Sequence, residues 1–505
     1  MSLEAPKKEN RETLALNGKQ DFAEPSSPEF ADDALALKFT LEHGEDLRYT
    51  AEWGRWSVWN GSVWKVDRTR DVYDRARRVC RRESARCEDP RHAPRIASAQ
   101  TVAAVERLAQ ADRRHAATIE QWDSDSWLLN TPAGVVDLRS GNLREARRDD
   151  YMTKTTTVAP NGNCPMWLSF LDWVTLGDRE LQGFMQRMCG YALTGSTEEH
   201  ALFFVFGHGG NGKSKFLEAI CGLMGDYART APIEVFVDSN NQKHPTELAG
   251  LQGARLVTAI ETEEGRRWAE SKLKALTGGD KIAARFMRQD FFEFTPQFKP
   301  IIAGNHKPSL RTVDEAIRRR FHLLPFEVTI SASERDPKLG EKLRAEWPGI
   351  LQWAIDGCIA WQKEGLNPPA RVKQATEDYL AEEDCLARWI EECTEEKAAA
   401  WSSSSDLFFS WTVWAKANGE IPGTPKRFSG NLDARGYERS RKNKARGFQG
   451  IRLLRRLVTD GDTSERYLRI ARACDGDKGA MCHNASLDAA VGEETLVAVG
   501  GELIV

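Results

Sequence analysis

Residues 202–220, LFFVFGHGGNGKSKFLEAI, decide the fold of this chain. Five apolar residues predict a buried strand, and the apolar spacing after Ser214 predicts a helix. Between them lies the phosphate-binding loop pattern G-x-x-x-x-G-K-[ST], in the strand–loop–helix setting that it requires. Its backbone N–H groups and Lys213 can hold the phosphates of ATP, and the Ser214 hydroxyl can ligate Mg²⁺. The expected nucleotide contacts are Gly207, His208, Gly209, Gly210, Asn211, Gly212, Lys213 and Ser214.

An acidic residue follows a second predicted strand. Residues 255–260 are mostly apolar, and Glu261 comes directly after them. Ligands of a parallel sheet lie beyond the carboxyl ends of its strands. A carboxylate there can hold the Mg²⁺ shell and polarise the attacking water, so Glu261 is the predicted catalytic acid and metal contact. Glu263 is left open between this role and a solvated loop, and Glu264 is interpreted as solvated.

Two further polar groups lie at places where such a site needs them. Asn305 follows the predicted strand 299–304, where an amide can sense the γ-phosphate or orient water, although Asn is also common in turns there. Arg318, Arg319 and Arg320 precede the apolar run HLLPF. A guanidinium from a neighbouring subunit can stabilise a transferring phosphoryl group, and the alternative is a solvated basic helix end.

The order and spacing of several segments resemble the superfamily 3 helicases, within the AAA+ class. These segments are GYALTGSTEEHALFFVFGHGGNGKS, RLVTAIETEEG, LKALTGGDKIAARF, KPIIAGNHKP and DEAIRRRFHLLPF. The resemblance covers about residues 120–455 and is closest to the phage and plasmid primase-helicases, relatives of the poxvirus primase-helicase. It implies a hexameric ring with ATP between subunits, and 3′ to 5′ translocation along one DNA strand. The catalytic residues that it implies are Lys213, Glu261 as the Walker B acid, Asn305 as the sensor, and Arg319 or Arg320 as the arginine finger.

The same resemblance implies two DNA contacts. The family's DNA-tracking hairpin falls at residues 282–294, with Arg288 at its polar tip as the candidate for gripping phosphates. Residues 390–456 resemble a winged helix that reads helix, turn, helix and two-stranded wing. Its basic stripe suits phosphate contacts. An ordinary surface hairpin and a solvated wing are the alternatives. The expected contacts of the wing are Arg439, Arg441, Lys442 and Lys444.

The region ahead of the match is short and mixed. About 120 residues precede it without a paired-carboxylate catalytic pattern, so we expect a helicase without its own primase. The segment RWSVWNGSVWKV predicts a hairpin around Asn60-Gly61, and an Arg-rich helical stretch follows. Aromatic and basic side chains there can stack on nucleic-acid bases, but a tryptophan core is the favoured interpretation.

Composition narrows the class of protein. The chain of 505 residues carries a net charge of −4, so any DNA binding must come from local patches. It has no apolar run of membrane length and no secretory signal at its start, which predicts a cytoplasmic protein of a bacterial host with no membrane partner. The ten cysteines form no CxxC pair, which favours reduced thiols over a zinc site.

The predicted fold class is α/β, with an AAA+ phosphate-loop ATPase core built on a parallel sheet. The expected organisation is a disordered arm (1–33), an α+β region (34–150), a helical collar (151–200), the ATPase core (201–335), a helical segment (336–389), a winged-helix-like domain (390–456) and a tail (457–505).

The predicted function is an ATP-dependent DNA helicase in phage or plasmid replication. It would act on single-stranded and forked DNA as a homo-hexamer, with a separate primase or polymerase as a further candidate partner. Two alternatives stay open. One is an ATP-dependent origin-binding or scaffold protein, and the other is a DNA translocase for packaging or defence.

Overall fold

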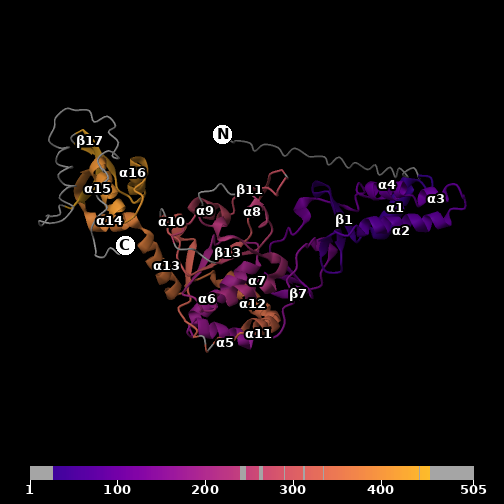
Figure 1. Cartoon of the computed structure of the whole chain (residues 1–505), viewed down its shortest axis with the longest axis horizontal. Helices are drawn as coiled ribbons and strands as arrows, with labels where there is room; N and C mark the ends of the chain where they lie inside the picture. The colour runs from indigo at the N-terminus through magenta and orange to yellow at the C-terminus, as the bar shows by residue number, and fades with distance from the viewer. Residues whose placement is uncertain are drawn as a thin grey trace, which may run out of the picture. The chain divides into compact units, whose positions relative to one another are not determined.

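The computed structural model describes residues 27–454, apart from 239–245, 261–264, 289, 311–312, 332, 334 and 443. The chain forms two compact units, Met1–Asp384 and Cys385–Val505 (Figure 1). Most of the predicted arm (1–33) and all of the predicted tail (457–505) lie outside the described residues; helix α1 begins within the arm, at Asp32. Among the described helices, none is long and apolar enough to cross a membrane.

The first unit begins with a small α+β domain. Its four-stranded sheet has the order β3-β2-β1-β4 and packs against four helices. The elements are α1 (Asp32–His43), β1 (Leu47–Thr50), β2 (Arg55–Trp59), β3 (Trp64–Val66), α2 (Asp71–Arg86), α3 (Ala93–Ile96), α4 (Ala99–Ala109) and β4 (Ala116–Ala117). Strands β2 and β3 form the hairpin predicted around Asn60-Gly61, with Trp59 opposite Trp64. Trp56 and Trp64 are buried, which confirms the tryptophan core for these two residues.

A three-stranded meander joins this domain to the core. It comprises β5 (Leu128–Thr131), β6 (Gly134–Asp137) and β7 (Asn142–Arg144), in the order β5-β6-β7. One turn, which contains Gly141, lies between β6 and β7, and a second, tighter turn separates β5 from β6.

The apolar stretch 165–195 forms two helices rather than one. Helix α5 (Pro165–Val174) and helix α6 (Arg179–Leu193) are separated by a tight turn. Leu176 and Gly177 both have left-handed backbone there, with φ of 57° and 76°. The Asp178 carboxylate then accepts the backbone N–H of Leu181 and caps α6. The apolar period continues across this break, which is why the sequence alone did not show it.

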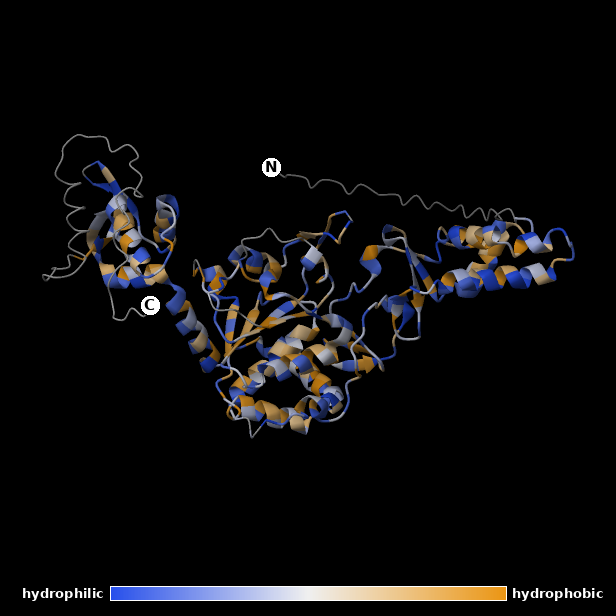
Figure 2. Ribbon diagram, viewed as in Figure 1, coloured by the Kyte–Doolittle hydropathy of each residue, from blue (hydrophilic) through white to orange (hydrophobic). Residues whose placement is uncertain are grey.

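The core is a five-stranded parallel sheet of order β14-β8-β13-β10-β9, as predicted for an α/β fold. Buried clusters cover both of its faces, and Figure 2 shows the apolar residues concentrated in these strands and the helices beside them. The elements are β8 (Leu202–Phe206), α7 (Lys213–Met224), β9 (Ala228–Thr230), α8 (Thr246–Ala249), β10 (Leu256–Ile260), α9 (Glu270–Gly278), β11 (Ile282–Ala284), β12 (Phe292–Phe294), β13 (Lys299–Gly304), α10 (Glu315–Arg318), β14 (Phe321–Pro325), α11 (Leu339–Ala345), α12 (Trp347–Glu364) and α13 (Ala370–Glu383).

Two buried cations hold the amino ends of the central strands. Arg255, just before β10, donates hydrogen bonds of 2.8 Å to the carbonyls of Leu193 and Leu128. Lys299, the first residue of β13, donates to the carbonyls of Thr194 and Ser196. Burial lowers the pKa of both groups, and neither has a carboxylate among the bonds that it makes to described residues. They tie α6 and the meander to the sheet.

The second unit begins with a helix that starts within the helical segment predicted at 336–389. The described part of the unit contains α14 (Cys385–Cys393), β15 (Thr394–Ser403), α15 (Ser404–Ala417), α16 (Pro425–Ala434), β16 (Arg439–Lys442) and β17 (Ala445–Leu453). Helices α15 and α16 are followed by the β16–β17 hairpin, and the interpretation of these elements as a winged helix stays a prediction. Strand β15 adds to this hairpin in the order β15-β17-β16.

The contact between α6 and α12 gives a prediction for stability. A β-carbon at Gly190 would lie 2.0 Å from the backbone nitrogen of Cys358, so Gly190→Ala must push α12 away. We expect a loss of about 3 kcal/mol in the free energy of unfolding. Gly183→Ala, in the same helix, meets only the tip of Arg187 at 3.5 Å and should stabilise by about 0.5–1 kcal/mol. Urea denaturation of both variants checks this, and equal effects would contradict the tight crossing.

Candidate functional site

The predicted phosphate-binding loop connects β8 to α7. Gly207 lies close to the residue that follows β14. A β-carbon on Gly207 would lie 2.0 Å from the carbonyl oxygen of that residue, Phe326. Gly212 has a left-handed backbone with φ of 91°, and its β-carbon would meet Val174 at 2.8 Å. Both positions therefore require glycine for physical reasons. Ser214 is exposed in the first turn of α7, where its hydroxyl can reach a metal ion.

Lys213 is a buried cation held only by neutral oxygens. Its side chain is 7% exposed, and the ammonium donates to the carbonyls of Gly207 and His208 and, at 3.0 Å, to Asn211 Oδ1. Burial lowers the pKa of Lys213 to about 8. An ammonium desolvated without a carboxylate gains strongly from an anionic ligand. The loop is therefore suited to an anionic phosphate.

The segment after β14 closes over this loop. The backbone N–H of Phe326 donates to Phe206 O at 2.7 Å, and that of Ile330 donates to Gly210 O at 3.0 Å. The Asn211 amide donates to Phe326 O at 2.7 Å while its oxygen accepts from Lys213. Asn211 thus links the lysine to this segment, which explains why an amide stands at that position of the loop.

Sequence reasoning missed Arg335. Its Nε donates to Ile330 O at 3.1 Å, and its guanidinium lies against Gly210, where an added β-carbon would be 2.5 Å from Nη2. The residue is exposed, so its remaining donors can face a ligand of the loop. No motif marks an arginine more than a hundred positions beyond the loop, and only the return of the chain after β14 brings the two together.

Two predicted site residues follow the strands β13 and β10, and the structure describes the first, Asn305, but not the second, Glu261. Asn305 is exposed directly after β13, whose last residue, Gly304, pairs with Phe206 at the start of the loop. Strand β10 ends at Ile260, which pairs with Ala303. Glu261 comes next and, with Glu263 and Glu264, lies outside the described residues. Its role as the catalytic acid stays a prediction.

The three arginines near α10 differ in their surroundings. Arg320 is buried, its Nε donates to Thr277 Oγ1 at 3.1 Å and its Nη1 to Ala316 O at 2.7 Å, and burial lowers its pKa. Arg318 lies 3.6 Å from the carboxylate of Asp384. Arg319 is exposed and has no ion pair to a described residue. Of the two candidates for the finger, only Arg319 projects from the subunit.

The predicted DNA contacts lie on exposed hairpins. Strands β11 and β12 pair antiparallel as predicted, and Arg288 is exposed at their tip with a left-handed φ of 61°. In the second unit, Arg441, Lys442 and Lys444 are exposed on the β16–β17 hairpin. Arg439 is also exposed, but its guanidinium already bonds to an acid, because its Nε donates to Asp433 Oδ1 at 2.7 Å.

Two family profiles match the chain, together covering most of the first unit. Residues 36–176 match the profile described as D5 N terminal like, and residues 205–320 match a family of unknown function, DUF5906. In these two regions the chain resembles the phage-type superfamily 3 helicases. The second profile covers the phosphate-binding loop, the end of β8 and the strands β10 and β13.

Relatives with helicase names are found among large DNA viruses. The helicase-named protein L207/L206 of Acanthamoeba polyphaga mimivirus is 25% identical over 323 residues, 59% of this chain and 34% of that protein. Protein 022R of Frog virus 3 is 25% identical over 50% of this chain and 28% of its own length. This chain therefore spans about a third of the length of these relatives. Among solved structures, the apo NrS-1 C-terminal region (305–718) aligns with a TM-score of 0.47 at 11% identity, covering 83% of this chain and 99% of that one.

The lowered pKa of Lys213 predicts how phosphate binding depends on pH. Below pH 8 the free chain already carries the charged ammonium, so binding needs no proton. Above pH 8 the free lysine becomes neutral, and binding of an anion must take up a proton. The association constant for ATP should fall by up to about tenfold per pH unit above pH 8. Calorimetry between pH 7 and pH 10 measures this. Lys213→Arg keeps its charge throughout and should give a flat profile, and a flat wild-type profile would contradict the assignment.

Proposed function

We propose that the chain is an ATP-hydrolysing DNA helicase, a ring-forming 3′ to 5′ translocase of phage or plasmid replication. The observation that carries the proposal is the buried Lys213 ammonium, held without a carboxylate in a phosphate-binding loop at the carboxyl end of a parallel sheet. The family profiles that match parts of the chain and the helicase names of its viral relatives support the same activity.

The proposed ATP site uses groups from four strand ends. The loop 207–214 would hold the phosphates, and Ser214 with Glu261 would hold Mg²⁺, which would screen the charge that develops on the transferred phosphoryl group. Glu261 polarises the attacking water and Asn305 orients it. Arg335 adds a second cation from the same subunit, because its guanidinium lies against Gly210.

The exposed Arg319 supports hydrolysis between subunits. A guanidinium that projects from the surface without an ion pair to a described residue can complete the site of a neighbour, as the hexamer implied by the family resemblance would require. Arg320 cannot serve without leaving its bonds to Thr277 and Ala316. We therefore assign the finger to Arg319.

The proposed DNA contacts differ in whether their charged groups already bond to an acidic side chain. Arg288 projects from the core and is the proposed contact in the channel. On the proposed wing, Arg441, Lys442 and Lys444 carry charge that can neutralise phosphates. Arg439 would have to exchange Asp433 for a phosphate, so we expect it to contribute less than the other three.

Substitution of the site residues tests the activity itself. Lys213→Ala should abolish ATP turnover and displacement of a strand from forked DNA, because no other buried cation replaces it. Glu261→Gln should bind ATP but hydrolyse it at least about a hundredfold more slowly. Glu263→Gln is the matched control and should keep most of the turnover. The reverse result for the two glutamates would reassign the acid, and normal strand displacement by Lys213→Ala would refute the assigned ATP site. Failure of the wild-type chain to displace a strand with ATP would refute the helicase.

The two arginines can be separated by mixing subunits. Arg319→Ala should lower turnover by about three orders of magnitude while ATP binding and thermal stability stay unchanged. Arg320→Ala should instead lower the melting temperature, because it leaves Thr277 Oγ1 and Ala316 O without their donor. Mixing Arg319→Ala with Lys213→Ala subunits should restore partial turnover, since some interfaces then hold both groups. Full turnover by a verified Arg319→Ala monomer would exclude a finger acting between subunits.

A further inference from the structure

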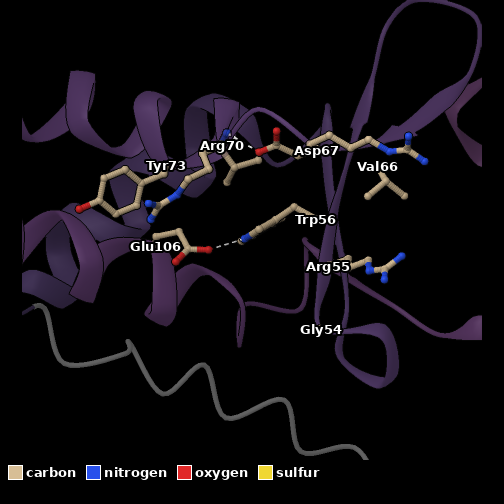
Figure 3. A pocket seen from close by; sticks show the side chains of 10 residues that line it. Gly54, Arg55, Trp56, Val66, Asp67, Arg70, Tyr73 and Glu106 are labelled. Atoms are coloured by element: carbon tan, nitrogen blue, oxygen red, sulfur yellow. Dashed lines mark hydrogen bonds between the residues drawn. The ribbon is translucent and has the colours of Figure 1, made fainter. Parts of the chain in front are cut away.

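A recess in the N-terminal domain lies apart from the ATP site. It has a volume of about 510 Å³ and is bounded by β2, the turn after β3 and the first turn of α2. Figure 3 shows Trp56 in its middle, with Arg70 and Tyr73 on one side and Arg55 on the other. Arg68 also lines it. Three arginines therefore surround one small recess.

The arginines of the recess form no ion pair with a described residue. Five other arginines of the domain do have acidic partners; these pairs are Arg75–Asp71, Arg78–Asp74, Arg82–Glu42, Arg86–Glu83 and Arg114–Asp112. Arg55, Arg68 and Arg70 are exposed, and none of them forms an ion pair with a described residue. The Arg70 guanidinium instead lies 4.5 Å from the ring centre of Tyr73. Three arginines against the two acids Asp67 and Glu106 leave the lining with an excess of positive charge.

The two acids of the recess are occupied by other donors. The Asp67 carboxylate accepts the backbone N–H groups of Thr69, Asp71 and Val72 at 2.9–3.0 Å. Burial opposes its ionisation, but these bonds outweigh burial and lower the pKa of Asp67. Glu106 accepts the indole N–H of Trp56 at 2.6 Å and the amide of Gln110 at 2.8 Å. Neither acid forms an ion pair with Arg55, Arg68 or Arg70.

The turn that carries two of the arginines is rigid and strained. Asp67 fixes residues 69, 71 and 72 through three backbone bonds. Between them, Arg70 has a left-handed backbone with φ of 63°, a conformation that glycine or asparagine adopts more easily. Strain of this kind persists where the surroundings impose it, and it fixes the direction of a side chain before a ligand arrives.

We propose that this recess binds the phosphodiester backbone of single-stranded nucleic acid. Three unpaired guanidinium groups match a chain of phosphates, because arginine presents several donors in a plane. A duplex is a stiff rod with its phosphates on a convex surface. A single strand bends and can place a phosphate inside a recess. Trp53, which is 37% exposed beside the pocket residue Gly54, offers a face on which a base can stack.

Salt dependence of binding tests the phosphate contacts in the full chain. The triple variant Arg55→Ala/Arg68→Ala/Arg70→Ala should bind a fluorescent oligo-dT about ten- to a hundredfold more weakly at low salt. The slope of log affinity against log salt should flatten by about 2, since each lost contact removes about 0.7. The matched control Arg81→Ala/Arg91→Ala/Arg95→Ala removes the same charge from exposed positions outside the recess and should change the slope far less. An equal loss in both variants would overturn the proposal.

Competitors distinguish the source of the anion. Oligo-rU should compete like oligo-dT, because the backbone is the recognised group. Inorganic phosphate, ATP and an acidic peptide should compete less well than oligo-rU at matched charge. Equal competition by any of them would overturn a nucleic-acid site. If the triple variant loses as much affinity for a duplex as for oligo-dT, the preference for a single strand would be overturned. ATP turnover without DNA should stay unchanged in the triple variant, so failure of this proposal and of the proposed ATPase can be told apart.

A single substitution separates folding from binding. Arg70→Gly removes the guanidinium and relieves the left-handed backbone, so it should raise the melting temperature while weakening oligo-dT. Photo-crosslinking of a bromodeoxyuridine oligonucleotide should label peptides within residues 53–73 in the wild-type chain and not in the triple variant. Wild-type crosslinks confined to other regions, or unchanged oligo-dT affinity in a stabilised Arg70→Gly chain, would refute the recess as the site.

Discussion

The candidate ATP site depends on an ammonium group that is removed from water without a counter-ion. Lys213 has three neutral acceptors, and each comes from the loop that an anion would enter. Asn211 fixes the lysine to the segment after β14, and that segment closes on the loop through Phe326 and Ile330. The geometry of the loop, the return of the chain and the position of Arg335 thus follow from solvating one cation.

Burial also sorts the arginines of this chain into different roles. Arg255 and Arg320 give their donors to carbonyl or hydroxyl oxygens and stabilise the fold of their own subunit. Arg319 and the arginines around Trp56 keep their donors toward solvent. A sequence cannot make this distinction, because adjacent arginines such as Arg319 and Arg320 are equivalent in any local pattern.

The sequence predicted the parts of the fold that local patterns determine. The strand–loop–helix unit, the parallel sheet and the hairpins at Asn60-Gly61 and at 282–294 are all confirmed, since each has its own apolar period or turn residues. The break between α5 and α6 was not predicted, because the apolar period runs through Leu176 and Gly177. Arg335 and the recess of Arg55, Arg68 and Arg70 were not predicted as sites either. Both arise from segments that are brought together only by tertiary contacts.

The buried pair Arg255 and Lys299 has a mechanical consequence. These cations bind the amino ends of two central strands to Leu128, Leu193 and the turn after α6, and releasing either one would leave desolvated carbonyls without donors. Such a joint resists hinging. If the proposed ATP cycle displaces the carboxyl edge of the sheet, these bonds would couple that displacement through the strands to the meander and to the turn after α6.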